Sequence, residues 1–191
     1  MSEQDLVALL LATFTGLGLA AACGLRVFVP LLVLGLAARS GSCEVVESFR
    51  WVATTPALVA FGFATVLEVV AFYVPWLDNL LDTIALPAAA IAGAVVATSV
   101  LVGMDPWLRW SLGVVAGAGV ATVVHVPTAA ARAASTATTG GAGNPAVATG
   151  ELAGAGLVSG MSVFAPIAVP MVVIALVAGS IHLVRKRRRA A

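Results

Sequence analysis

The length of its apolar blocks is the feature that most constrains this chain. Five blocks are visible, at 5–38, 52–74, 84–102, 108–126 and 152–184. A membrane-spanning helix needs roughly 20 apolar residues, so each of the three middle blocks fits one span. Each outer block has about 33 residues, or roughly 50 Å of helix, which exceeds a hydrocarbon core of roughly 30 Å. We therefore expect each outer block to be an interrupted helix, two spans or a re-entrant hairpin.

Composition supports a membrane location. Hydrophobic residues make up 61% of the 191 residues and charged residues 10%, against roughly 45–50% and 25% in soluble domains. A soluble protein of this length has too little interior to hide so much apolar surface. The N-terminal residues include no basic segment, so the first block is expected to be retained. We predict one all-α, polytopic membrane domain over 1–191, whose first partner is the lipid bilayer.

The two outer blocks contain the same short motif. Residues 24–30 read GLRVFVP and residues 160–166 read GMSVFAP, so each has a glycine and a proline six positions apart. Proline removes a helix donor and glycine loosens the backbone, which predicts breaks between Gly24 and Pro30 and between Gly160 and Pro166. With three spans between them, two-span or hairpin blocks would form an inverted repeat, an arrangement found in transporters. One broken span each would instead make the two copies parallel.

Orientation is predicted from the basic tail at 185–191. Lysine and arginine favour the cytoplasmic side, so the C-terminus is expected inside and, with an odd number of spans, the N-terminus outside. Residues 127–150 are then a cytoplasmic connection. Its Ala, Thr and Gly content is typical of a flexible linker, whereas its TGGAGNP run (139–145) favours an ordered turn.

Charged residues inside apolar blocks are candidate binding groups, because burying a charge in lipid is costly. Glu68 lies deep in the second block, where it can carry protons, bind a cation or form a structural salt bridge. Arg26 lies inside the first predicted break, where it can neutralise Glu68, bind an anionic group or extend to the interface. Its counterpart in the second motif is Ser162, so the repeat is asymmetric in charge.

Other polar residues give weaker indications. Asp78 and Asp82 share a helix face and predict either an acidic mouth or a solvated helix start. His125 ends the fourth block, Asn144 belongs to the predicted turn, and Glu151 is expected to cap the last block. The two cysteines are too few for a disulfide framework or a metal site. We expect no metal, no cofactor and no nucleic-acid partner.

Several of these residues also carry a resemblance to a family. The chain resembles the DUF4126 family of small bacterial integral membrane proteins over most of its length. The first and last motifs are the more specific ones. The matching positions are 22–39, Leu67, Glu68, Pro75, Asp78, Asp82, His125, Arg132, 139–141, 144–145 and Glu151. The chain departs from the family at Ala71-Phe72-Tyr73, where similar proteins carry a polar, charged stretch, so an ion relay there is not expected.

The favoured function is a transporter or channel for a small solute or ion, with its site at the paired helix breaks. A non-transporting membrane scaffold or assembly partner is the alternative, indicated by small-residue faces and the basic tail. An enzyme is not expected, because no nucleophile and base pattern is present. The resemblance implies a multi-pass protein of the bacterial inner membrane, and small size favours a homo-oligomer.

Overall fold

The structure, a computed structural model, describes residues 2–73 and 75–171, apart from the side chains of 75–83. The described chain is helical throughout its regular elements. These are α1 (Glu3–Leu25), α2 (Phe28–Ser40), the 3-10 helix η1 (Glu47–Ala53), α3 (Thr55–Phe72), α4 (Pro75–Val100), α5 (Pro106–Leu112), the π-helix η2 (Gly113–Ala118), α6 (Gly119–Thr139) and α7 (Asn144–Phe164).

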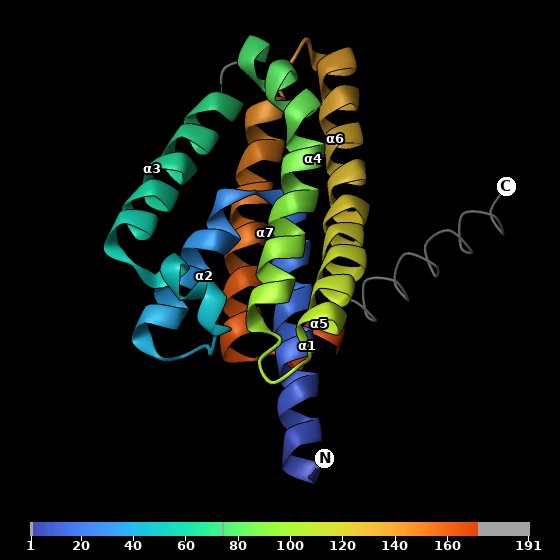
Figure 1. The fold of residues 1–191 in the computed structure, drawn as a ribbon. Coiled ribbons are helices and arrows are strands. Elements are labelled where there is room, and N and C mark those ends of the chain that lie inside the picture. The colour runs from blue at the N-terminus through green and yellow to red at the C-terminus, as the bar shows by residue number, and fades with distance from the viewer. Residues whose placement is uncertain (1, 74, 172–191) are drawn as a thin grey trace, which may run out of the picture.

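Helix α1 lies at the centre of the bundle and packs against α4, α6 and α7 (Figure 1). Helix α2 runs back beside α1 toward the N-terminal end, and α3 flanks α2 on the outside (Figure 1). Leu19, Leu34 and Val96 are fully buried between these helices. The core is therefore built mainly from α1, α2 and α4, and α6 and α7 add one buried apolar residue each.

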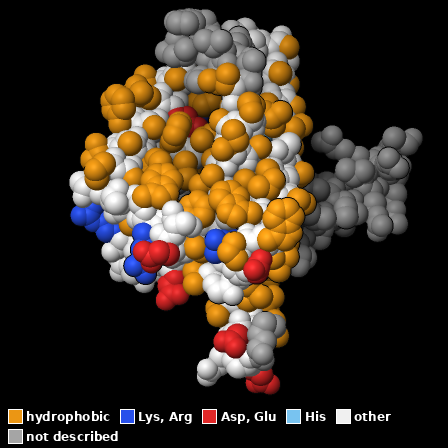
Figure 2. Space-filling model, in the orientation of Figure 1, with side chains coloured by type: hydrophobic (Ala, Val, Ile, Leu, Met, Phe, Trp, Pro, Cys, Tyr) orange, Lys and Arg blue, Asp and Glu red, His pale blue; other side chains and the backbone are white. Residues whose placement is uncertain are grey.

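Four helical segments of the described chain are long and apolar enough to cross a membrane. They are Glu3–Leu25, Thr55–Phe72, Pro106–Thr139 and Asn144–Phe164. Large apolar side chains cover most of the visible face, and charged side chains gather toward the N-terminal end (Figure 2). Such an apolar exterior is expected when lipid is the solvent. The protein is thus an all-α membrane protein.

Small residues bring two helices into very close contact. A Cβ atom added to Gly93 on α4 would lie 2.6 Å from the carbonyl oxygen of Gly117 in η2, and one added to Gly117 would lie 2.7 Å from Ala97 Cβ. Glycine at both positions removes the side chains that would hold the backbones apart. These small-residue faces are used inside the chain, which explains them without a second subunit.

The predicted connection at 127–150 is wrong. Helix α6 continues through Pro127 to Thr139, and α7 already begins at Asn144, so only 140–143 form the turn. Gly140 and Gly141 adopt positive φ angles of 63° and 90° there, a conformation that glycine adopts without strain. Proline does not end α6, because helices in a packed membrane bundle tolerate it. Within the TGGAGNP run at 139–145, residues 140–143 form an ordered turn and the residues on either side are helical.

The chain leaves helical conformation near both repeated motifs, but at different positions. α1 ends at Leu25, Arg26 is extended (φ −146°, ψ 130°), and α2 starts at Phe28. In the second motif α7 continues through Gly160 and Ser162 to Phe164, and Ala165 is its C-cap. The glycines of the two motifs are therefore helical, and the two breaks are not in register. The predicted segment 152–184 passes outside the described residues beyond 171, as does the tail at 185–191.

Candidate functional site

Arg26 sits on the extended backbone between α1 and α2, and its side chain points into the bundle. It is 2% exposed. Its Nη2 atom donates to the carbonyl oxygen of Ala148 at 2.9 Å and lies 3.1 Å from Glu151 Oε2. The helix break is what aims the guanidinium at α7 instead of along α1. The side chain is buried in the ion pair and does not extend to an interface.

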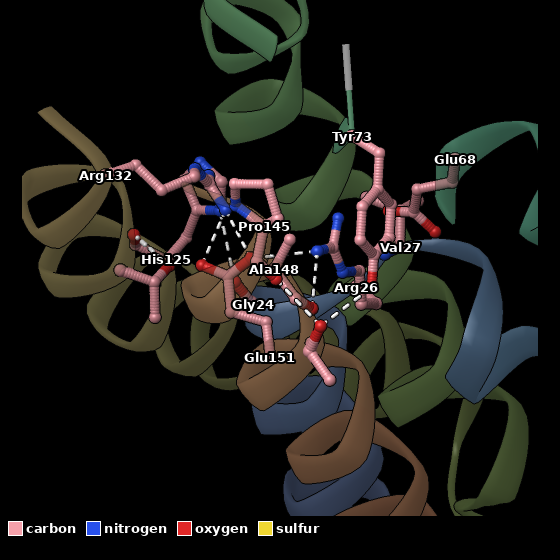
Figure 3. Close-up of polar contacts among 12 residues, drawn as sticks. Gly24, Arg26, Val27, Glu68, Tyr73, His125, Arg132, Pro145, Ala148 and Glu151 are labelled. Atoms are coloured by element: carbon pink, nitrogen blue, oxygen red, sulfur yellow. Dashed lines mark hydrogen bonds and ion pairs between the residues drawn. The ribbon is translucent and has the colours of Figure 1, made fainter. Parts of the chain in front are cut away.

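Glu151 joins two arginines. Arg132 on α6 donates from Nη1 to Glu151 Oε1 at 2.6 Å and also contacts Oε2. Glu151 is 5% exposed and Arg132 is 1% exposed. The predicted capping role of Glu151 is wrong, because α7 begins seven residues earlier, at Asn144. Three charged side chains from the break, α6 and α7 thus form a buried cluster (Figure 3).

An aromatic ring closes this cluster on one side. The guanidinium carbon of Arg26 lies 3.9 Å from the centroid of the Phe72 ring, and that of Arg132 lies 4.7 Å from it. A guanidinium over a ring face is attracted by the ring quadrupole. Phe72 is 5% exposed at the end of α3. Phe72 is therefore a partner of both arginines.

Glu68 caps the second half of the broken helix. Its Oε1 accepts from the backbone N–H of Val27 at 2.8 Å, and its Oε2 accepts from that of Phe28 at 3.2 Å. The first N–H groups of a helix have no partner within it, and a carboxylate there also opposes the helix dipole. Glu68 therefore binds the backbone next to Arg26, at Val27 and Phe28. The guanidinium of Arg26 pairs with Glu151 instead.

His125 satisfies the first half of the break. Its Nδ1 atom lies 3.1 Å from the carbonyl oxygen of Gly24, which it serves as donor. Gly24 lets α6 approach, because an added Cβ there would lie 2.7 Å from Val124 Cβ and closer still to the Ala121 carbonyl oxygen. Broken backbone inside a membrane needs such partners from neighbouring helices. Glu68 and His125 supply them from α3 and α6.

The turn before α7 lies beside the cluster. Asn144 is 3% exposed and donates from Nδ2 to Thr136 Oγ1 at 2.9 Å. Tyr73 at the end of α3 shares a hydrogen bond of 2.7 Å with Thr149 on α7. These contacts tie the ends of α3, α6 and α7 together at the level of the cluster.

The second motif does not take part in this site. Ser162 donates to its own helix at the Val158 carbonyl oxygen and contacts α1 at Gly18, eight residues or roughly 12 Å of helix from Arg26. Pro166 lines a hollow of about 850 Å³ at the other end of α1, together with Asp5, Glu44 and Asp105. A common site formed by both breaks, with Arg26 and Ser162 at matching points, is therefore not what the structure shows.

Asp78 and Asp82 belong to the first turns of α4, and their side chains lie outside the described residues. In the part of the chain that the structure describes, no three His, Cys, Asp or Glu side chains form a group able to hold a metal ion.

The buried face of α7 links the hollow to the charged cluster. Its buried residues from the cluster toward the second break are small or polar as far as Ser162, and apolar Val163 follows them: Ala148, Glu151, Ala155, Ser159, Ser162 and Val163. Ser159 is fully buried, and its hydroxyl has no hydrogen-bond partner among the described residues. Buried hydroxyls are usually paired, so this one requires an explanation.

A family model, described as a domain of unknown function (DUF4126), matches residues 13–186. The chain belongs to the DUF4126 family. No curated protein and no solved structure matches it. The positions that carried the resemblance include Glu68, His125, Arg132 and Glu151, and in this DUF4126 protein all four surround the helix break.

Arg132 and Phe72 are absent from the site residues predicted from sequence. Arg132 lies in the Ala- and Thr-rich stretch that was interpreted as a connection, where a charged residue is unremarkable. Its spacing of seven from His125, which places both on one face of a helix, was the signal available. Phe72 gave no signal, because one aromatic residue at the end of an apolar span is ordinary.

Proposed function

We propose that this DUF4126 protein is a membrane transporter or channel for a small solute or ion, with its path along the interface of α1 and α7. The observation that carries the proposal is the buried α7 face, whose small and polar side chains lead from the Glu151 cluster to Ser162, next to Val163 in the wall of the hollow. Small residues also serve helix packing, but the buried carboxylate of Glu151 is of the kind that marks ion and substrate pathways inside membranes.

The hollow suits the entrance of such a path. Asp5, Glu44 and Asp105 line it near one end of the bundle, and Thr15 and Val163 lie at its inner wall. From Thr15 to Arg26 the path would follow eleven residues of α1, roughly 16 Å. The unpartnered hydroxyl of Ser159 lies within this stretch of α7, where a passing polar species or water would hydrogen-bond to it.

The balance of charges in the cluster around Glu151 favours a site that responds to protons or ions. Arg26 and Arg132 offset Glu151 and Glu68, so the four groups sum to zero when all are ionised. Gain or loss of a proton or ion would upset that balance inside a medium where charge is costly. A charged species that reached the cluster would therefore compete with the existing ion pairs of Arg26 and Arg132.

The proposal includes an inverted repeat, which two contacts between α1 and α7 favour. Neighbouring helices α1 and α7 run in opposite directions into their breaks (Figure 1). The gapless alignment that pairs Gly24 with Gly160 also pairs Gly18 with Gly154. Gly18 lies close to Ser162, and Gly154 lies close to Leu25. In the alignment the counterpart of Ser162 is Arg26, which follows Leu25 in the chain, so the two contacts nearly correspond. Reciprocal contacts of this kind are expected from two-fold related halves, the design of many transporters.

Flux into liposomes tests the proposal. The purified protein should carry at least one member of a broad panel of ions and small solutes faster than empty liposomes do. Ser159→Val should lower that flux, because it replaces the buried hydroxyl with an apolar group. Ser111→Val is the matched control, since Ser111 is half-buried on α5, outside the α7 face, and donates to the Trp107 carbonyl oxygen of its own helix. Absence of flux across the whole panel would sink the proposal.

A further inference from the structure

A second cavity lies on the outer side of the helix break, away from the α1 and α7 interface. It measures about 530 Å³ and lies between the start of α2, the second half of α3 and the middle of α4. Leu67, Val70 and Ile84 line it and are each more than half exposed. The cavity therefore reaches the apolar surface and opens toward lipid, as the hollow between α3 and α4 in Figure 2 shows.

The chemistry of this cavity is apolar with one charge. Among the described residues that line it, Glu68 is the charged one and every other is apolar. Figure 2 shows acidic atoms in the floor of the hollow, with hydrophobic side chains around them. Arg26 and Arg132 do not line the cavity and are directed to Glu151. A ligand in the cavity would thus meet a carboxylate without meeting the two guanidinium groups.

Glu68 retains capacity to bind a donor. Its two oxygens accept from Val27 N–H and Phe28 N–H, whereas a carboxylate offers about four acceptor sites. The rings of Phe28 and Phe72 also line the cavity, and aromatic faces attract cations, most strongly where water is excluded. The wall therefore combines apolar surface, two rings and an anionic acceptor.

We propose that this cavity is a lipid-facing binding site for amphipathic cations, meaning molecules with an apolar body and a single positive charge that lies against Glu68. Charge complementarity selects this class. An anionic amphiphile would place its charge beside the carboxylate, and a neutral one without a donor group would leave the remaining acceptor positions of Glu68 unused. This binding site does not depend on the proposed path along α7. Binding of a cation without any flux would therefore support this proposal and contradict only the transport proposal.

Tetraphenylphosphonium and tetraphenylborate form a matched pair of probes, with nearly the same shape and opposite charge. Binding of each is measured separately by equilibrium dialysis against the full chain in zwitterionic nanodiscs, with empty nanodiscs subtracted. The cation should bind at least about tenfold more tightly than the anion, since opposite charges in a low-dielectric site attract strongly. Glu68→Gln should remove most of this preference, and Glu47→Gln, at an exposed residue outside the cavity, should not.

A pocket-filling variant keeps the test decisive if Glu68→Gln does not fold. Ala85 lines the cavity, and Ala60 on α3 is exposed and does not line it. Ala85→Leu should weaken binding of the cation, and Ala60→Leu should not. Equal binding of both probes, or cation binding unchanged by Glu68→Gln and Ala85→Leu, would overturn the proposal.

Discussion

Arg26 and Glu151 form a buried ion pair, with 3.1 Å between Nη2 and Oε2, although one lies on a helix break near the N-terminus and the other on the last described helix. Arg132 shares the same carboxylate. This pairing links the first helix break to α6 and α7. The stability of the bundle therefore depends on keeping these charges paired, because an unpaired charge inside a membrane protein is costly.

Removing the shared carboxylate should destabilise the protein strongly. Glu151→Gln leaves two buried guanidinium groups without their counter-charge, and breaking a buried pair in this way costs about 3–5 kcal/mol. Thermal unfolding in detergent micelles measures the loss. Glu47→Gln is the control, because the Glu47–Arg50 pair at 2.9 Å is 70–78% exposed and such pairs contribute about 1 kcal/mol or less. Equal losses in the two variants would contradict the buried-pair interpretation.

Glu68 should act as a helix cap, with an effect that depends on what replaces it. Glu68→Gln keeps one acceptor for Val27 or Phe28, whereas Glu68→Leu leaves both N–H groups without an acceptor. We expect the leucine variant to be the less stable by about 1–3 kcal/mol, the cost of unsatisfied buried donors. Hydrogen exchange at Val27 and Phe28 would report the loss directly. Unchanged protection in the leucine variant would show that the carboxylate is not their acceptor.

The two motif glycines should respond in opposite ways to alanine. Gly24→Ala should be strongly destabilising, because its Cβ would collide with the Ala121 carbonyl and with Val124. Gly160→Ala should be neutral or stabilising by up to about 1 kcal/mol, because nothing lies within 4 Å of the added carbon and alanine favours helix. The unfolding temperatures of the Gly24→Ala and Gly160→Ala variants measure the difference. Equal changes in the two variants would show that the two glycines have equivalent roles.

Cys43 should react slowly with alkylating agents at ordinary pH. Partial burial and the nearby Glu44 raise the pKa of its thiol from 9.0 to about 11, and the thiolate is the reactive form. Its alkylation rate should still rise about tenfold between pH 9 and pH 10, where an ordinary cysteine levels off. Cys43→Ser isolates the contribution of buried Cys23. A plateau near pH 9 would show an unperturbed thiol.

Cysteine labelling of intact cells tests the predicted orientation. Ser48→Cys in η1 and Thr138→Cys at the end of α6 both introduce exposed thiols, in a Cys43→Ser background. The basic tail predicts a cytoplasmic C-terminus, and hence Ser48→Cys should react with an impermeant maleimide from outside. Thr138→Cys should react only after permeabilisation. The reverse pattern would place the N-terminus inside.

The apolar blocks alone determined that this chain is an all-helical membrane protein, because a bilayer leaves no other use for so much apolar sequence. Glu68, Arg26 and His125 were also identifiable, since ionisable groups inside or at the end of a span stand out in sequence. The glycine and proline at 24–30 enclose the point where α1 ends and α2 begins. These features are local, and local sequence is sufficient to specify them.

Tertiary structure decided which charges pair and where the helices end. Arg132 lies in a stretch whose Ala and Thr residues indicated a linker, whereas in the structure that stretch is helical and its charge is buried against Glu151 on α7. Gly24 and Gly160 occupy equal places in the same motif, yet one touches α6 and the other faces open space. The physical reason is that burial and ion pairing belong to contacts between distant segments, which the spacing of residues along the chain does not contain.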